Sequence, residues 1–308
     1  MRTNNNRVNS SPVPYVGRFA PSPTGPLHFG SLVAAVGSYL DARARSGQWL
    51  LRMEDVDEPR CSQVHADEIL RALEILGFEW DGAVLYQSRR KAHYRAALDR
   101  LVESGDAYAC ACTRKEIVDS SLKGIEGPLY PGTCREGLKG RAARAWRVQV
   151  DEAPVCFDDR LQGRHCQRLA NDVGDFVVRR ADGYFAYQLA VVVDDATQCV
   201  THVVRGADLL VSTPRQIYLQ RLLGFSTPEY LHLPVVLNQA GQKLSKQTLA
   251  PALEARNASR DLFAALSFLG QEPPSMLRVA PVAEILQWAT GVWRGNFSLS
   301  RASSKPSA

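Results

Sequence analysis

The chain has 308 residues, of which 45% are hydrophobic and 22% are charged, as in an ordinary globular protein. This length allows one large domain or two closely packed ones. The lack of any run of about 18 hydrophobic residues excludes a membrane-spanning helix, and a formal net charge of +5 permits a polyanionic partner without requiring one.

The N-terminal residues 1–14 are rich in Asn, Ser and Pro and have no apolar core, so they predict a disordered leader and not a secretory signal. The C-terminal residues 298–308 have a similar composition and predict a flexible tail. The seven cysteines do not follow a regular disulfide framework, which favours a reducing compartment and a cytoplasmic protein.

Residues 15–107 alternate between predicted strands and predicted helices. Such alternation is typical of a parallel α/β sheet. The predicted strands are 15–20 and 49–53, and the predicted helices are 28–44, 64–76 and 89–104.

The alternation breaks in residues 108–171, which are rich in Gly, Cys and Arg and too long for a structureless loop. We therefore predict an inserted subdomain. Its basic residues form either a solvated surface or a surface for phosphates, and the sequence leaves both possibilities open. The basic residues from position 135 onward are Arg135, Lys139, Arg141, Arg144, Arg147, Arg160, Arg164 and Arg168.

Regular periodicity returns in residues 172–250, which predict the second half of the α/β domain. Residues 251–297 predict a helical segment with three leucines on one face. The periodic stretches are 176–179, 185–193, 200–205 and a helix at 214–223, and the leucines are Leu262, Leu266 and Leu269.

A Pro- and Gly-rich loop at 21–27 connects the first predicted strand to the first predicted helix. A helix start of this kind presents free N–H groups and a partial positive charge, which suits phosphate. Gly25 and Gly30 allow close approach, and His28 is either a donor to a phosphate oxygen or simply a hydrogen-bonded histidine at a helix end. Because Ser31 and not lysine follows Gly30, the loop is not a P-loop.

A second segment, 243–247, places Lys243 and Lys246 in a polar loop. Two lysines on a mobile loop can close over a triphosphate and stabilise charge that develops on it. A basic surface loop with no such role has the same composition.

In this order, the two segments resemble the ATP-binding signatures of class I aminoacyl-tRNA synthetases. Residues 18–25 and 52–57 resemble the opening of glutamyl-tRNA synthetases, and 204–208 and 213–216 match further segments. The resemblance implies an α/β Rossmann-type catalytic domain, formed by 15–107 and 172–250, that activates glutamate with ATP and Mg²⁺.

Two features depart from full-length glutamyl-tRNA synthetases. The chain ends about 60 residues after the second signature, which leaves no obvious room for an anticodon-binding domain, and the insertion contains a cysteine cluster. Both features are similar to those of the glutamyl-Q tRNA(Asp) synthetases, as are segments 184–190 and 243–247. These short paralogues attach glutamate to the queuosine base in the anticodon of tRNA(Asp).

The resemblance also implies roles for particular residues. A guanidinium is the best bidentate partner of a carboxylate, so Arg18 and Arg205 are expected to bind the glutamate carboxylates. Glu54 is expected to pair with the ammonium group, and Tyr187 to supply a hydroxyl and a flat wall, although an ion pair or a core tyrosine would fit the same positions. The implied glutamate site comprises Arg18, Phe19, Ala20, Pro21, Ser22, Glu54, Tyr187 and Arg205; His28, Gly30 and Lys246 would bind ATP, and His28, Lys243 and Lys246 would be catalytic.

The cysteine cluster predicts a metal site. Cys110, Cys112 and Cys134 supply three of the four ligands of a tetrahedral zinc ion. The residues alone leave the fourth ligand open, with Cys156 or Cys166 as candidates, whereas the resemblance implies Tyr130. We expect one structural zinc per chain, which would hold together a small subdomain. The other cysteines, Cys61, Cys156, Cys166 and Cys199, are expected to be small buried side chains.

The predicted function is therefore activation of L-glutamate as glutamyl-adenylate and its transfer to queuosine in tRNA(Asp), by a monomer that needs no membrane. One alternative is a truncated glutamyl-tRNA synthetase that charges a tRNA 3′ end. The other is a non-catalytic, zinc-stabilised RNA-binding module. The presence of both His28 and Lys246 argues against this second alternative, because RNA binding requires neither residue.

Overall fold

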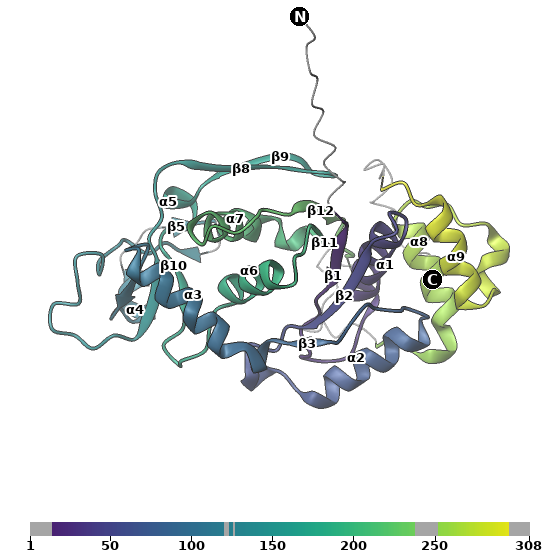
Figure 1. Cartoon of the computed structure of the whole chain (residues 1–308), viewed down its shortest axis with the longest axis horizontal. Helices are drawn as coiled ribbons and strands as arrows, with labels where there is room; N and C mark the ends of the chain where they lie inside the picture. The colour runs from purple at the N-terminus through teal and green to yellow at the C-terminus, as the bar shows by residue number, and fades with distance from the viewer. Residues whose placement is uncertain (1–13, 120–122, 126, 238–251, 296–308) are drawn as a thin grey trace, which may run out of the picture.

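A computed structural model describes residues 14–119, 123–125, 127–237 and 252–295. The predicted tail, Lys243, Lys246 and all of the predicted leader except Pro14 lie outside these ranges. The described part is elongated in Figure 1, with the inserted strands at one end, the C-terminal helices at the other and the main sheet between them. Among the helices in these ranges, none combines the length and hydrophobicity that a membrane-spanning helix needs.

The first half of the main sheet is parallel, with the strand order β1-β2-β3. Helix α1 packs on it through side chains with helical spacing, and Leu32, Val36 and Leu40 are fully buried. The elements of this half are β1 (Val16–Phe19), α1 (Phe29–Arg43), β2 (Gln48–Met53), η1 (Glu58–Arg60), α2 (Gln63–Ile75), β3 (Leu85–Tyr86), η2 (Gln87–Arg90) and α3 (Lys91–Glu103).

The second half adds two parallel strands beside β1. The N–H of Thr201, just before β11, donates to the carbonyl of Val16 in β1 over 2.9 Å, and β11 pairs with β12. The strands β3, β2, β1, β11 and β12 therefore follow one another across the molecule. The elements of this half are α6 (Tyr187–Thr197), β11 (His202–Gly206), η3 (Ala207–Ser212), α7 (Thr213–Leu222) and β12 (Glu229–Leu233).

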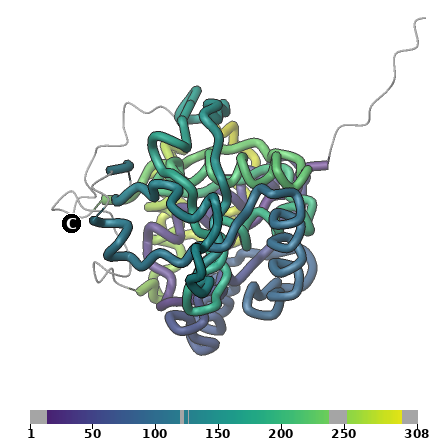
Figure 2. Tube along the Cα trace, turned by 90° about the vertical axis from the view of Figure 1, so that its left-hand side faces the viewer, coloured from purple at the N-terminus to yellow at the C-terminus, as the bar shows by residue number. Residues whose placement is uncertain are grey.

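The segment that separates these halves in the sequence forms most of a small antiparallel sheet of order β10-β7-β4. This sheet lies at the end of the molecule that faces the viewer in Figure 2. From it a hairpin, β8–β9, runs back to the main sheet, where Asp159 pairs with Tyr230 of β12. The elements are β4 (Ala107–Cys110), α4 (Arg114–Asp119), β5 (Lys123–Gly124), β6 (Gly127–Pro128), β7 (Ala145–Val148), β8 (Pro154–Asp159), β9 (Gly163–Arg168), α5 (Leu169–Asp172) and β10 (Phe176–Arg179).

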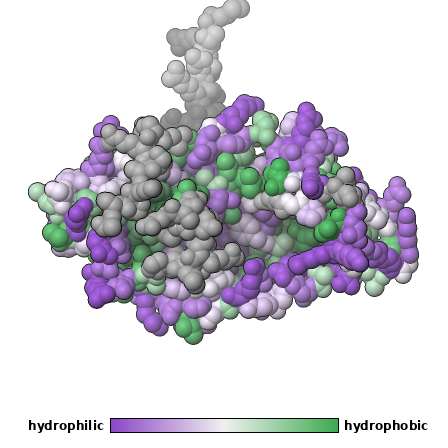
Figure 3. Space-filling model, turned by 180° about the vertical axis from the view of Figure 1, so that it is seen from behind, coloured by the Kyte–Doolittle hydropathy of each residue, from purple (hydrophilic) through white to green (hydrophobic). Residues whose placement is uncertain are grey.

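The C-terminal helices pack against α1, and the three leucines predicted to share a face are all buried. On the face shown in Figure 3 most residues are hydrophilic, and hydrophobic ones lie around a central hollow. The C-terminal elements are η5 (Ala255–Asn257), α8 (Ala258–Phe268), η6 (Ser275–Val279) and α9 (Val282–Val292).

A buried carboxylate, Asp41 of α1, connects four parts of the chain. It accepts two hydrogen bonds from Arg160, at 2.6 and 2.9 Å, and one each from Arg45, Tyr15 and Trp293. Arg160 directly follows β8, and Trp293 directly follows α9. This network therefore holds the hairpin and the C-terminal helices against the main sheet.

Some arginines of the insertion have internal partners. Arg135 pairs with Asp175 at 2.6 Å, Arg147 donates to the carbonyl of Asp175 at 2.7 Å, and Arg160 pairs with Asp41. Other basic residues of the same segment are exposed, namely Lys139, Arg144, Arg164 and Arg168.

The expectation that the four remaining cysteines are small buried side chains is wrong. Cys156 and Cys166 lie directly opposite each other in the β8–β9 register and form a disulfide. Cys199 is exposed and Cys61 is partly exposed. Because the partners on a hairpin share one face, cysteines ten residues apart can meet there without being in a core.

Candidate functional site

The loop after β1 and the loop after β2 are joined by backbone hydrogen bonds. The N–H of Glu54 donates to the carbonyl of Pro21 at 2.9 Å, and the N–H of Ser62 donates to that of Pro23 at 3.0 Å. The carboxyl ends of neighbouring parallel strands meet at one edge of the sheet, where open α/β sheets bind ligands. Arg18 and Glu54 lie at this edge.

Four charged side chains form a buried cluster there. Arg18 donates to Asp195 of α6 at 3.1 Å, and Arg52 donates to the same carboxylate at 2.7 Å and to Glu54 at 3.4 Å. The exposed fractions of these residues are between 0 and 8%. Asp195 and Arg52 were not among the predicted site residues. A signal for Asp195 was present, because a charged pair follows directly on the apolar residues 189–193.

The cluster shifts the pKa values of its own carboxyl groups. Burial acts to raise the pKa of Asp195, but Arg18 and Arg52 outweigh it, so the pKa is lowered and the carboxylate is charged. Burial raises the pKa of Glu54, and Arg52 and Arg18 offset this only in part. The neighbouring Arg90–Asp194 pair is balanced. Three guanidinium groups, those of Arg18, Arg52 and Arg205, lie near the Glu54 and Asp195 carboxylates.

Arg205 of β11 is held from two sides and has one free edge. Its Nε donates to His232 at 3.1 Å, and its Nη2 donates to Thr213 and Gln216, both at 2.8 Å. Among the described residues, no acceptor lies within hydrogen-bond distance of its buried Nη1. A buried donor without a partner is costly, so this edge suits the carboxylate of a ligand.

Tyr187, the first residue of α6, is half-buried beside the same charges. Its pKa is raised first by burial and then by Glu54, whereas Arg205 and Arg18 act to lower it. The four side chains to which sequence reasoning gave individual roles toward glutamate therefore lie close enough to interact electrostatically.

The other predicted residues of the first signature lie on or next to the loop. His28 caps α1, with Ser31 donating its N–H to Nδ1 over 3.3 Å, and Gly30 is the second residue of that helix. Ala20, Pro21 and Ser22 are at least partly exposed, but the Phe19 side chain packs in the core against Trp49. Any contact between Phe19 and glutamate would thus involve its backbone.

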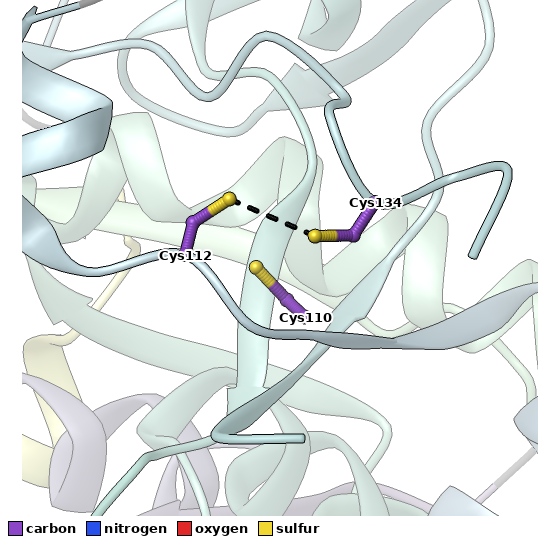
Figure 4. A group of neighbouring side chains, drawn as sticks. All are labelled: Cys110, Cys112 and Cys134. Atoms are coloured by element: carbon purple, nitrogen blue, oxygen red, sulfur yellow. Dashed lines mark hydrogen bonds between the residues drawn. The ribbon is translucent and has the colours of Figure 1, made fainter. Parts of the chain in front are cut away.

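The predicted metal ligands come together in the insertion. The sulfur atoms of Cys110, Cys112 and Cys134 all lie within 4.8 Å of one another and point toward one centre (Figure 4). Cys110 ends β4, Cys112 follows two residues later, and Cys134 comes from the loop before β7. The buried triad is consistent with a structural metal.

The Tyr130 hydroxyl lies beside these sulfur atoms. It is 3.4 Å from the sulfur of Cys110 and 3.8 Å from that of Cys112, and the Cys112 and Cys134 sulfurs are 3.6 Å apart. A zinc ion with Zn–S distances of about 2.3 Å would hold its four ligand atoms about 3.7 Å apart, so these separations fit a tetrahedron. Cys156 and Cys166, the open alternatives, are bonded to each other.

Arg147 supports this centre from one side. Its Nε donates to the sulfur of Cys110 over 3.4 Å, and its guanidinium carbon lies 3.9 Å from the centre of the Tyr130 ring. Hydrogen bonding to a thiolate is a common way to stabilise metal-bound sulfur. Sequence reasoning considered Arg147 only as a basic surface residue.

Comparison with known proteins agrees with the family resemblance seen in the sequence. Residues 15–261 match the family described as tRNA synthetases class I (E and Q), catalytic domain. The glutamyl-Q tRNA(Asp) synthetase of Chromobacterium violaceum is 60% identical to this chain, over 95% of this chain and 96% of its own length. That of Dechloromonas aromatica is 63% identical over 91% of this chain and 94% of its own length.

Among solved structures, the glutamate-tRNA synthetase of Elizabethkingia anophelis superposes with a TM-score of 0.72 and 23% identity. The match covers 89% of this chain but 65% of that enzyme, and at this identity it shows the fold alone. The fold is thus the α/β class I synthetase catalytic fold with a parallel sheet, as predicted. The chain belongs to the class I tRNA synthetase (E and Q) catalytic-domain family and, within it, to the glutamyl-Q tRNA(Asp) synthetases.

Proposed function

We propose that the protein is a ligase that activates L-glutamate with ATP and transfers the glutamyl group to queuosine in the anticodon of tRNA(Asp). The observation that carries this proposal is the clustering of Arg18, Glu54, Tyr187 and Arg205. Its guanidinium groups complement the two carboxylates of glutamate, and Glu54 complements the ammonium group. The names of the relatives supply the acceptor. Because its partner is a tRNA, we expect the protein to act in the cytoplasm.

In the first step, an oxygen of the glutamate α-carboxylate attacks the α-phosphorus of ATP. A P–O bond forms, pyrophosphate leaves, and glutamyl-adenylate results. Arg18 and Arg205 hold the carboxylates and Glu54 holds the ammonium group, so the reacting oxygen is positioned before the reaction. His28 and the start of α1 face the phosphates, which ATP brings together with Mg²⁺.

Lys243 and Lys246 keep the roles that the resemblance implies for them, although both lie outside the described residues. In the second step, a hydroxyl of the queuosine cyclopentenediol attacks the activated carbonyl, and AMP leaves. An anticodon loop is single-stranded, which is where RNA is read by its sequence. Enzymes that modify the anticodon can therefore select their tRNA at the active site itself.

The position of the attached glutamate tests this proposal. The protein is incubated with labelled glutamate, ATP and tRNA(Asp), with and without queuosine, and the label is located by nuclease digestion. We expect labelling of the anticodon nucleotide only when queuosine is present. Label at the 3′ end would instead identify a truncated glutamyl-tRNA synthetase, and no label with intact tRNA binding would identify a binding module.

We further propose that the metal held by Cys110, Cys112, Tyr130 and Cys134 is zinc, present once per chain. Metal analysis of Cys134→Ala is expected to show loss of most of the zinc, because a tetrahedral site has no ligand to spare. Tyr130→Phe, which removes only the hydroxyl, should weaken binding by about 10- to 100-fold, as a chelator titration would measure. Cys199→Ala changes an exposed cysteine elsewhere and serves as the control. The assignment would be contradicted if the unmodified protein contained no zinc and a chelator did not change its stability.

A further inference from the structure

Arg205 has a neighbour whose position follows directly from the sheet. Arg205 in β11 and His232 in β12 are register partners, so their side chains lie on the same face of the two strands. His232 is fully buried, and its Nε2 accepts the hydrogen bond from Arg205 Nε over 3.1 Å. An arginine is always charged and only donates, so His232 must present a lone pair at this nitrogen.

Asp159, at the end of β8, determines which nitrogen carries the proton. Its Oδ2 lies 2.6 Å from His232 Nδ1, while its Oδ1 accepts backbone N–H groups from Leu161 and Gln162 at 3.0 and 2.8 Å. A carboxylate held in this way accepts the Nδ1 proton, which leaves Nε2 unprotonated. Burial lowers the pKa of His232, Asp159 opposes this and Arg205 reinforces it, so the net pKa is lowered and the ring is neutral.

We propose that Asp159 and His232 are positioning residues for glutamate binding: Asp159 fixes the tautomer of His232, and His232 orients the Arg205 guanidinium so that its free Nη1 edge faces the carboxylate. This inference rests on the proposed role of Arg205 in binding glutamate. With Nε held by His232 and Nη2 held by Thr213 and Gln216, the guanidinium plane is fixed before the substrate arrives. Such preorganisation reduces the cost of ordering the arginine on binding.

The decisive variant is Asp159→Asn, which keeps the shape of the side chain. The amide oxygen can still accept the backbone N–H groups of Leu161 and Gln162, but the amide nitrogen would donate to Nδ1. The ring proton would then move to Nε2, where it would point at the N–H of Arg205. We expect the Kd for glutamate, measured by calorimetry, and its KM in pyrophosphate exchange to rise about 10- to 100-fold, with the KM for ATP nearly unchanged.

Two histidine variants separate positioning from a purely structural role. His232→Leu removes the acceptor and should weaken glutamate binding as much as Asp159→Asn does. His232→Gln places an amide oxygen near the position of Nε2 and should restore much of the affinity. The control is His202→Gln, because His202 lies three residues before Arg205 on the opposite face of the sheet and pairs with Glu229.

Wild-type affinity for glutamate in Asp159→Asn, or an equal rise in the KM for ATP, would overturn the positioning role. So would a His232→Gln variant no better than His232→Leu, a comparison that remains valid if Asp159→Asn does not fold. A different result would contradict the proposed function: the unmodified protein would bind glutamate but catalyse no pyrophosphate exchange. If the unmodified protein does not bind glutamate at all, both proposals fall.

Discussion

Asp195→Ala is expected to lower the free energy of unfolding by about 3–5 kcal/mol and to reduce glutamate-dependent pyrophosphate exchange by at least about 100-fold. The carboxylate of Asp195 accepts hydrogen bonds from Arg18 and Arg52, both almost fully buried. Its removal leaves two guanidinium groups without their main counter-charge. The loss of activity follows because Arg18, released from Asp195, would no longer be fixed in the position proposed for binding glutamate.

Chemical denaturation measures the first effect, and exchange at saturating ATP measures the second. Asp182→Ala is the matched control, since Asp182 is an exposed aspartate whose ion pair with Arg180 is at the surface. It should change stability and exchange little. If Asp195→Ala unfolded at the same denaturant concentration as the unmodified protein, the buried cluster would not contribute to stability as we describe.

Asp41→Ala is expected to destabilise the protein by a similar amount, about 3–5 kcal/mol, without any residue of the glutamate pocket being changed. The variant leaves Arg160, Arg45, Tyr15 and Trp293 without their common acceptor. Differential scanning calorimetry and denaturation would both report the loss. Asp99→Ala, which changes an exposed aspartate of α3, is the control and should leave the protein as stable as before.

The contribution of Asp41 also has a predictable pH dependence. Burial acts to raise the pKa of Asp41, but Arg160, Tyr15 and Arg45 outweigh it and hold the pKa well below its usual range. In the unfolded chain the group would titrate near its ordinary pKa of about 3.9. The stabilisation is therefore complete above that pH and is lost as the pH falls toward the lower, folded pKa.

Unfolding free energies of Asp41→Ala and of the unmodified protein, compared between pH 7 and pH 3, test this directly. The difference between the two proteins should be constant near neutrality and shrink below about pH 4, where the unfolded chain binds a proton that the folded protein does not. A difference that stayed the same down to pH 3 would show that the aspartate is not paired in the folded state.

The parts of the fold that depend on local patterns could be predicted from the sequence. Strands β1 and β2 and helices α1, α2, α3 and α7 lie within two residues of the predicted ranges, because apolar spacing, Gly and Pro determine them locally. Strands β3 and β12 were not predicted. The first has two residues, and the second contains a buried histidine that interrupts its apolar pattern.

Partners distant in the sequence were the main omission at the site. Asp195 is 177 residues from Arg18, and Asp159 is 73 residues from His232, so no spacing or composition connects them. Arg18, Glu54 and Arg205 were identified through the resemblance to known synthetases, and the structure places them in or beside strands that end at one edge of the sheet. Tyr130 was identified only through the resemblance, because a phenol is an unusual zinc ligand. In the structure its hydroxyl lies 3.4 Å from the sulfur of Cys110 and 3.8 Å from that of Cys112.

The β8–β9 hairpin restricts how chimeric proteins could be built from this chain and its relatives. A shortened chain in which β4 was joined directly to β10 would lose Asp159 and Arg160 together. His232 would then lose Asp159 and Asp41 would lose Arg160, even though both residues lie outside the removed segment. An exchange of the inserted segment between relatives should therefore end between β7 and β8, so that the recipient keeps the hairpin that belongs to its own sheet.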